Sequence, residues 1–348
     1  MLSANLKKLS LVTMIILALL MTGCNSNADH TERGELEERE IEQQSVTNND
    51  GSVQPVPSEA VSALERGLSY EQQGDLPQAI ANYSQAIQLT PDYVEAYLKR
   101  GWAYRQQENW DKALGDFEAV IRLDPQNPAG YQQRGRVYVN KKEFIKGIAD
   151  CSRAISLDQN NAEAHNCLAA AYVAKGEYER AITHSNKAIA LNYDPLSWPY
   201  SNRGSAYMSL GKIDQAIDDY NEAIRLDPYF WDAYYNRGIA YFFKENYEQA
   251  LSDFSEAIRV DANKSAAYTN RGWTYHQIGN YEQAIADYTE ALRLEPEDAS
   301  TYLNRSLAYE MQENIELAIA DLEKALKLSD KPKTRRFIEG RLKELQGE

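Results

Sequence analysis

Residues 231–264 read WDAYYNRGIAYFFKENYEQALSDFSEAIRVDANK, and residues 265–298 read SAAYTNRGWTYHQIGNYEQAIADYTEALRLEPED. The two stretches have the same length and share NRG, NYEQA and EA at the same positions. In the first stretch, Tyr234, Gly238 and Tyr241 lie four and three residues apart, which places them on one face of a helix. The second half of each stretch repeats this spacing, so each stretch predicts two amphipathic helices.

The 34-residue period extends far beyond these two stretches. Eight tyrosines occupy one slot of it, with one residue inserted after the fourth: Tyr70, Tyr104, Tyr138, Tyr172, Tyr207, Tyr241, Tyr275 and Tyr309. A small residue lies three positions before each tyrosine, and another lies nine positions after it. This repetition indicates stacked helix pairs, because each pair leaves an apolar face that only the next pair can cover. The excess of 24 tyrosines over 7 phenylalanines follows partly from this repeat.

The order of small residue, Tyr, Ala, aromatic ring and Pro resembles the tetratricopeptide repeat (TPR). The resemblance implies an all-α fold, an α-solenoid of about eight TPR helix-turn-helix repeats that forms a right-handed superhelix and ends in a C-terminal capping helix. We assign repeats 1 to 8 to residues 60–93, 94–127, 128–161, 162–196, 197–230, 231–264, 265–298 and 299–332, and the capping helix to 333–348. Glycines suited to a left-handed helix end share one slot: Gly74, Gly176, Gly211 and Gly279. Helix-capping residues occupy the next slot: Asp75, Asn109, Asn246 and Asn280.

The N-terminal 23 residues have the layout of a signal peptide, with two lysines before an apolar stretch at 9–21. A membrane-spanning helix needs roughly 17 or more apolar residues. The stretch Leu20-Met21-Thr22-Gly23-Cys24 resembles a bacterial lipobox, with Met21 where Leu is usual. The resemblance implies lipidation of Cys24 and export to the extracytoplasmic side of a bacterial membrane, with the outer membrane as one option; ordinary secretion or a retained anchor are the alternatives. Residues 24–59 are acidic and expected to be a disordered tether.

Six repeats carry Arg beside the first small residue, and each of these has Asp sixteen residues later. The pairs are Arg100/Asp116, Arg134/Asp150, Arg203/Asp219, Arg237/Asp253, Arg271/Asp287 and Arg305/Asp321. Repeat 4 loses both members together, with Leu168 and His184, and repeat 1 has Arg66 against Asn82. Joint loss within one repeat predicts ion pairs between the two helices of a repeat.

Repeat 4 and the end of repeat 3 hold an irregular cluster of Cys151, His165, Cys167 and His184. Thiol and imidazole ligands suit zinc, but the spacings match no ligand motif, so we predict no metal site and no cofactor. A disulfide between the two cysteines suits an exported protein. We favour two buried free thiols, while the disulfide stays open.

In the TPR family, the first helix of each pair lines a concave groove in which partner peptides or helices bind. Carried onto repeats 5 to 8, this resemblance predicts the groove residues Trp198, Asn202, Met208, Tyr235, Asn236, Ile239, Phe242, Phe243, Asn270, Trp273, His276 and Asn304. The rings and Met are expected to bind partner side chains, and the recurring Asn amides to hold a peptide backbone. The alternative is that these Asn and rings only pack between neighbouring repeats.

The formal net charge of -15 disfavours a nucleic-acid partner, since nucleic-acid binders need basic surfaces. No nucleophile, metal or phosphate-binding motif occurs, which predicts a protein that is not an enzyme and has no small-molecule substrate. We therefore predict a membrane-tethered TPR lipoprotein that acts as a protein-protein interaction scaffold. Resemblance also allows an assembly or adaptor lipoprotein for pilus and secretin or peptidoglycan-enzyme complexes. A metal-binding or catalytic protein centred on repeat 4 is the rival class.

Overall fold

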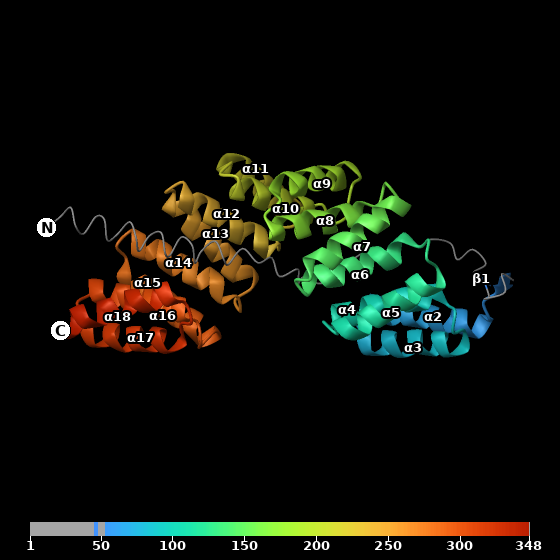
Figure 1. Ribbon diagram of the computed structural model, residues 1–348, viewed down its shortest axis with the longest axis horizontal. Helices are drawn as coiled ribbons and strands as arrows, with labels where there is room; N and C mark the ends of the chain where they lie inside the picture. The colour runs from blue at the N-terminus through green and yellow to red at the C-terminus, as the bar shows by residue number, and fades with distance from the viewer. Residues whose placement is uncertain (1–44, 48–52, 348) are drawn as a thin grey trace. The chain divides into compact units, whose positions relative to one another are not determined.

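The computed structural model describes residues 45–47 and 53–347, and Cys24 lies outside them. Seventeen helices and two short strands occur in this described part (Figure 1). The strands are β1 (Ser45–Thr47) and β2 (Val53–Pro55). The helices are α2 (Ser58–Gln72), α3 (Leu76–Leu89), α4 (Val94–Gln106), α5 (Trp110–Leu123), α6 (Pro128–Asn140), α7 (Phe144–Leu157), α8 (Ala162–Lys175), α9 (Tyr178–Ala190), α10 (Ser197–Ser209), α11 (Ile213–Leu226), α12 (Trp231–Phe243), α13 (Tyr247–Val260), α14 (Ser265–Gln277), α15 (Tyr281–Leu294), α16 (Ala299–Met311), α17 (Ile315–Leu328) and α18 (Pro332–Gln346).

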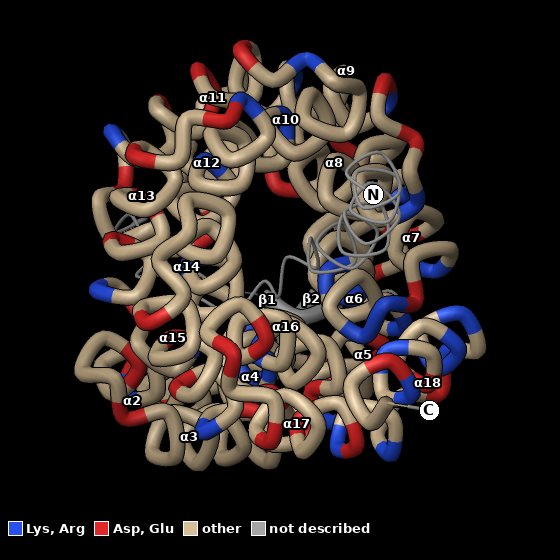
Figure 2. The backbone as a smooth tube through the Cα atoms, turned by 90° about the vertical axis from the view of Figure 1, so that its left-hand side faces the viewer, with Lys and Arg blue, Asp and Glu red and all other residues tan. Residues whose placement is uncertain are grey.

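The chain forms two compact units, which we describe separately: the N-terminal unit up to Ala206 and the C-terminal unit from Tyr207. Within each unit, the two helices of a repeat pack together, and the second also packs on the first helix of the next repeat. The predicted all-α repeat architecture is confirmed. At the C-terminal end, α18 buries Ile338 and Leu342 against Leu303 and Leu322 of repeat 8, and it carries the basic residues seen beside the C-terminus in Figure 2.

Residues 24–44 and 48–52 of the predicted tether lie outside the described residues, and the described remainder differs from the prediction. We expected residues 24–59 to lack structure, but β1 and β2 pair as antiparallel strands and α2 begins at Ser58. Val56 is buried with Ala60 and Ala63 in the core of repeat 1. The acidic composition concealed this because a single apolar residue of the tether, Val56, makes the contact with repeat 1.

A small residue and an aromatic ring meet where the two helices of a repeat cross. A Cβ added to Gly238 of α12 would lie 2.8 Å from a ring carbon of Phe254 of α13, so only glycine allows this approach. The turns also match the prediction: Gly279 has φ of +80°, and Asn280 accepts a hydrogen bond from the backbone N–H of Gln283. The conserved spacing within each repeat therefore follows from the helix crossing and from the turn between the helices.

The predicted ion pairs join the two helices within a repeat. The Nε and Nη2 of Arg237 donate to the two carboxylate oxygens of Asp253 at 2.8 and 2.6 Å. The same bidentate arrangement occurs in Arg100/Asp116, Arg134/Asp150, Arg271/Asp287 and Arg305/Asp321. Arg203 and Asp219 belong to different units, and their pairing stays a prediction.

Four of these five arginines, all but Arg134, also donate a hydrogen bond to the repeat before their own. Arg237 Nη1 donates to Asn221 at 2.6 Å, and Arg271 Nη1 donates to Ser255 at 3.1 Å. One guanidinium therefore holds three helices: both helices of its repeat and the second helix of the preceding one. Burial raises the pKa of Asp253, while Arg237 opposes that rise, so the carboxylate depends on its arginine for stabilisation.

Candidate functional site

An apolar pocket lies among α12, α13 and α14 in the C-terminal unit, where these helices follow one another in Figure 1. The pocket is shallow, because the space within it that the centre of a water-sized sphere can occupy is about 10 Å³. The lining residues are Ile239, Phe242, Phe243, Phe254, Asn270 and Trp273. Five of these six are predicted groove residues, and the structure brings them together from two repeats. The sixth, Phe254, is buried, and it was assigned from the sequence only to the helix crossing.

The pocket is built on a rigid aromatic base. Tyr235 is buried beneath it, with its ring stacked on Trp231 at 4.7 Å and tilted against Phe254 at 6.1 Å between centroids. The half-buried Phe242 and Phe243 pack edge to face at 6.2 Å. Trp231 and Tyr235 therefore support the pocket, while the two phenylalanines remain partly available to a ligand.

The predicted asparagines are used mainly between repeats. Asn270 Nδ2 donates to the hydroxyl of Tyr235 at 2.9 Å, and Asn202 Nδ2 donates to Asn166 Oδ1 at 2.9 Å. Asn304 is buried as well, and Asn236 is half-buried. The structure thus gives the amides of Asn202 and Asn270 a packing role, and only Asn270 also lines the pocket.

The remaining predicted residues do not line the pocket. Met208 packs against the same apolar cluster as Phe242 and Phe243. His276 stacks on Trp273 with 5.1 Å between ring centroids, and burial lowers its pKa to about 4. Trp198 is buried and belongs to the N-terminal unit, as does Asn202, so these two are described apart from the pocket.

Sequence reasoning missed Asp232, the second residue of α12. Its side chain is buried, with 7% of the residue exposed, and its Oδ2 has no hydrogen-bond partner. Burial raises its pKa to about 7, and Lys264 acts in the opposite direction. The ammonium of Lys264 lies over the Trp231 ring at 5.8 Å and 3.9 Å from Asp261. The available sequence signal was an acid directly after Trp231 at the start of a first helix.

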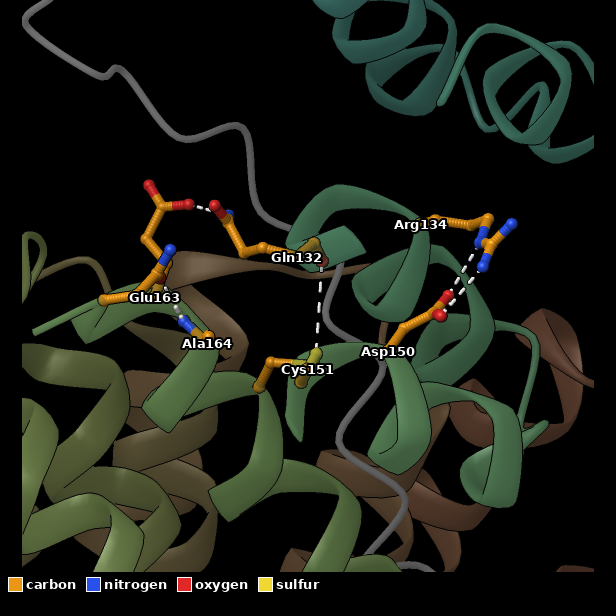
Figure 3. The surroundings of a disulfide bond; sticks show 8 residues. Gln132, Arg134, Asp150, Cys151, Glu163 and Ala164 are labelled. Carbon is orange, nitrogen blue, oxygen red and sulfur yellow. Dashed lines mark hydrogen bonds and ion pairs between the residues drawn. A yellow bond between two sulfur atoms is a disulfide. The ribbon is translucent and has the colours of Figure 1, made fainter. Parts of the chain in front are cut away.

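The cluster in repeats 3 and 4 corrects our preference for free thiols. Cys151 of α7 and Cys167 of α8 form a disulfide, with their Cα atoms 6.4 Å apart (Figure 3). Gly135 makes room for it, since an added Cβ would lie 2.5 Å from the sulfur of Cys151. Sulfur atoms bonded to each other are not thiolate ligands, so the combined thiol and imidazole site of the rival hypothesis is not formed. The part of the chain that the structure describes holds no cluster of three metal-ligating side chains.

Two histidines replace the missing ion pair of repeat 4. His165 and His184 approach at 2.9 Å between their Nδ1 atoms, and the ring of Tyr172 stacks on His184. Burial lowers the pKa of both, to about 4 for His184, where the neighbouring His165 and Arg180 lower it further. Both rings are therefore neutral at pH 7, and one donates its proton to the other.

These features define an α-helical repeat protein with an apolar pocket. Models described as tetratricopeptide repeat match residues 64–128, 128–161, 151–183, 231–264, 265–298 and 299–332, and one described as TPR repeat matches 204–244. The repeats of this chain are therefore tetratricopeptide repeats. No curated protein matches the chain.

Several solved structures share the fold. The APC/C hetero-tetramer Cut9-Hcn1 aligns at 18% identity and a TM-score of 0.64, over 80% of this chain and 55% of that one. A tetratricopeptide repeat protein from Parabacteroides merdae aligns at 18% identity and 0.56, over 72% and 99%. The human IFIT1 dimer with PPP-AAAA aligns at 18% identity and 0.60, over 81% and 72%. Among the described helices, none is long and apolar enough to span a membrane.

Proposed function

We propose that this protein is a non-enzymatic scaffold that binds a segment of a partner protein at the pocket of α12, α13 and α14. The observation that carries the proposal is the pocket itself, which gathers Ile239, Phe242 and Phe243 of one repeat with Trp273 of the next. Partly exposed aromatic side chains on a rigid base are typical of the centre of protein interfaces. Proteins with this fold act in general as scaffolds for protein partners.

The charge of the chain favours a protein partner over a nucleic acid. The IFIT1 neighbour is solved with PPP-AAAA, but this chain has a net charge of -15 and would repel phosphates. We include membrane attachment in the proposal: lipid on Cys24 would hold the repeats outside the cytoplasm at a bacterial membrane. An assembly or adaptor role for pilus and secretin or peptidoglycan-enzyme complexes is a narrower version of the same function.

The test is site-specific crosslinking in native membranes. A photoreactive p-benzoylphenylalanine replaces Phe242, which lines the pocket, and separately replaces Tyr229, which is 71% exposed and not part of it. We expect the Phe242 position to yield one dominant protein adduct that the Tyr229 position does not yield. Mass spectrometry of the adduct then identifies the partner segment.

Two further measurements complete the test. Unlabelled wild-type protein should compete for the adduct, whereas protein with Phe242→Ala should compete less than one tenth as well, because an aromatic anchor contributes about 2 kcal/mol or more. Far-ultraviolet circular dichroism confirms that the variant is folded. Equal adducts at both positions, or equal competition by the variant, would place the partner elsewhere on the protein.

A further inference from the structure

Three acids, Glu95, Glu163 and Asp232, occupy the same slot in different repeats, and the last two have different surroundings. Glu163 is the second residue of α8, and Asp232 is the second residue of α12. The Oε2 of Glu163 accepts a hydrogen bond from the side-chain amide of Gln132 in the preceding repeat (Figure 3). The Oδ2 of Asp232 has no such donor. The slot therefore accepts an acid in repeats 4 and 6, but of these two only repeat 4 has a hydrogen-bond donor for that oxygen.

An ionised carboxylate without a partner is costly to bury. Removing one from water without a compensating donor costs several kcal/mol, and buried polar atoms are nearly always hydrogen-bonded. Lys264 attracts the Asp232 carboxylate, but its ammonium lies over Trp231 and 3.9 Å from Asp261, and it donates no hydrogen bond to Asp232 Oδ2. Trp231 Nε1 is likewise buried without a hydrogen-bond partner. Two polar atoms of adjacent residues thus lack partners at the start of α12.

Asp232 lies on the same face of α12 as the pocket. At about 100° per residue, positions 232, 239 and 243 of a helix fall within about 40° of one another. Ile239 and Phe243 line the pocket, so Asp232 lies two turns before it along the same stripe. Seven residues of helix span about 10 Å, which equals about three residues of an extended peptide.

We propose that the partner segment is an extended peptide that places a lysine or arginine at Asp232 and an aliphatic or aromatic side chain, three residues away, in the pocket. This inference rests on the proposed function and adds the chemistry of the partner. A cationic group supplies the donor that the Asp232 carboxylate lacks, and a charge-assisted hydrogen bond in a buried site is stronger than a neutral one. The net charge of -15 also favours the approach of a basic peptide.

The experiment measures fluorescence polarisation of labelled synthetic peptides on the purified repeat region with its tether. The probes are Ser-Lys-Ser-Ser-Leu-Ser and its reverse, Ser-Leu-Ser-Ser-Lys-Ser, because the direction of the bound chain is an outcome of the test. In matched probes, norleucine replaces Lys and removes the charge, or Ser replaces Leu and removes the pocket group. We expect one direction to bind and to lose about tenfold or more in affinity when norleucine replaces Lys.

Two variants that each remove one negative charge distinguish the effect of Asp232 from the effect of the net charge of the protein. Asp232→Asn keeps the shape of the side chain, and we expect it to abolish the preference for Lys over norleucine. Asp218→Asn on α11 makes the same change of charge at an exposed site and should leave the preference intact. The preference should also grow about tenfold from pH 6 to pH 8, since the pKa of Asp232 is about 7 and only its ionised form attracts the cation.

The outcomes distinguish this inference from the proposed function. Binding that needs Leu but is indifferent to Lys, or an unchanged preference in Asp232→Asn, would overturn the basic-peptide inference and leave the pocket as a binding site. Binding of neither probe, together with no adduct at position 242, would overturn both. A preference lost equally in Asp218→Asn would show only an unspecific effect of net charge.

Discussion

Repeats 3 and 4 in the N-terminal unit and repeats 6 and 7 in the C-terminal unit use the same repeat slots for different purposes. In repeat 4, Cys167 is bonded to Cys151, and His165 is paired with His184. In repeat 6, the corresponding region holds half-buried phenylalanines, an open apolar pocket and an acid without a donor for its Oδ2. In the first region, the cysteines and histidines contact one another within the protein. The second leaves half-buried rings and polar atoms without hydrogen-bond partners on one helix face, which is the face at which we propose that a partner binds.

The largest effect is expected when one member of the repeat 6 ion pair is replaced by the residue that repeat 4 has in that slot. Leu168 stands in repeat 4 where Arg237 stands in repeat 6, so we consider Arg237→Leu. This change leaves Asp253, which is 4% exposed, without its bidentate partner. Removing one member of a buried pair costs about 3–5 kcal/mol. We expect a loss of this size in the free energy of unfolding, measured by urea denaturation.

A double variant checks the explanation. Replacing both residues, Arg237→Leu with Asp253→Leu, removes the stranded charge, and replacement of both partners costs much less than removal of one. The double variant should therefore be more stable than Arg237→Leu alone. If the single and double variants lose the same stability, the ion pair is not what holds α12 to α13.

The next effect concerns two half-buried histidines, His184 in the N-terminal unit and His276 in the C-terminal unit. The pKa of His184 and that of His276 are lowered to about 4, mainly by burial, from an ordinary value of 6.5. Between these values the unfolded chain binds more protons than the folded one. The contribution of these histidines to the free energy of unfolding is therefore fully present above about pH 6.5, and it decreases as the pH falls towards 4. Because His184 is only half-buried, we expect roughly 1 kcal/mol from it after allowing for solvent screening.

Single substitutions assign this pH dependence to its unit. His184→Asn keeps a polar group beside His165 but does not titrate, so the urea midpoint should change less between pH 6.5 and pH 4.5 than in the wild type. His276→Asn should reduce the change separately, and the two reductions should add, since the residues lie in different units. An unaltered pH dependence in both variants would assign it to other groups, which are His165 and the carboxylates.

The sequence predicted the features that repeat and missed those that depend on one neighbour. The crossing of Gly238 with Phe254 and the pairing of Arg237 with Asp253 follow from spacing within one repeat, and each recurs along the chain. The disulfide was left open because spacing does not show how closely α7 and α8 approach. Asp232 was missed for a related reason: Glu163 in the same slot has a donor in the preceding repeat, so the slot alone does not show that an acid lacks one.

The smallest effect is expected at a repeat slot where the two units have the same backbone conformation. The residue between the helices of a repeat has a left-handed conformation in both, with φ of +54° at Glu108 in the N-terminal unit and +58° at Glu245 in the C-terminal unit. Residues with a Cβ are disfavoured there by about 1 kcal/mol, whereas glycine is not. Glu108→Gly and Glu245→Gly should each raise the free energy of unfolding by about 0.5–1 kcal/mol, the flexibility of glycine in the unfolded chain offsetting part of the gain.

Gly279→Ala is the matched opposite, since Gly279 occupies this slot with φ of +80° and has open space around it. It should lose about the amount that Glu245→Gly gains, because only backbone conformation changes. Urea denaturation of the three variants measures this directly. Equal gains at Glu108 and Glu245 would show that the units share one repeat framework, so that their differences lie in the side chains of the cysteine and histidine cluster and of the pocket. A gain in one unit alone would mean that the frameworks themselves have diverged.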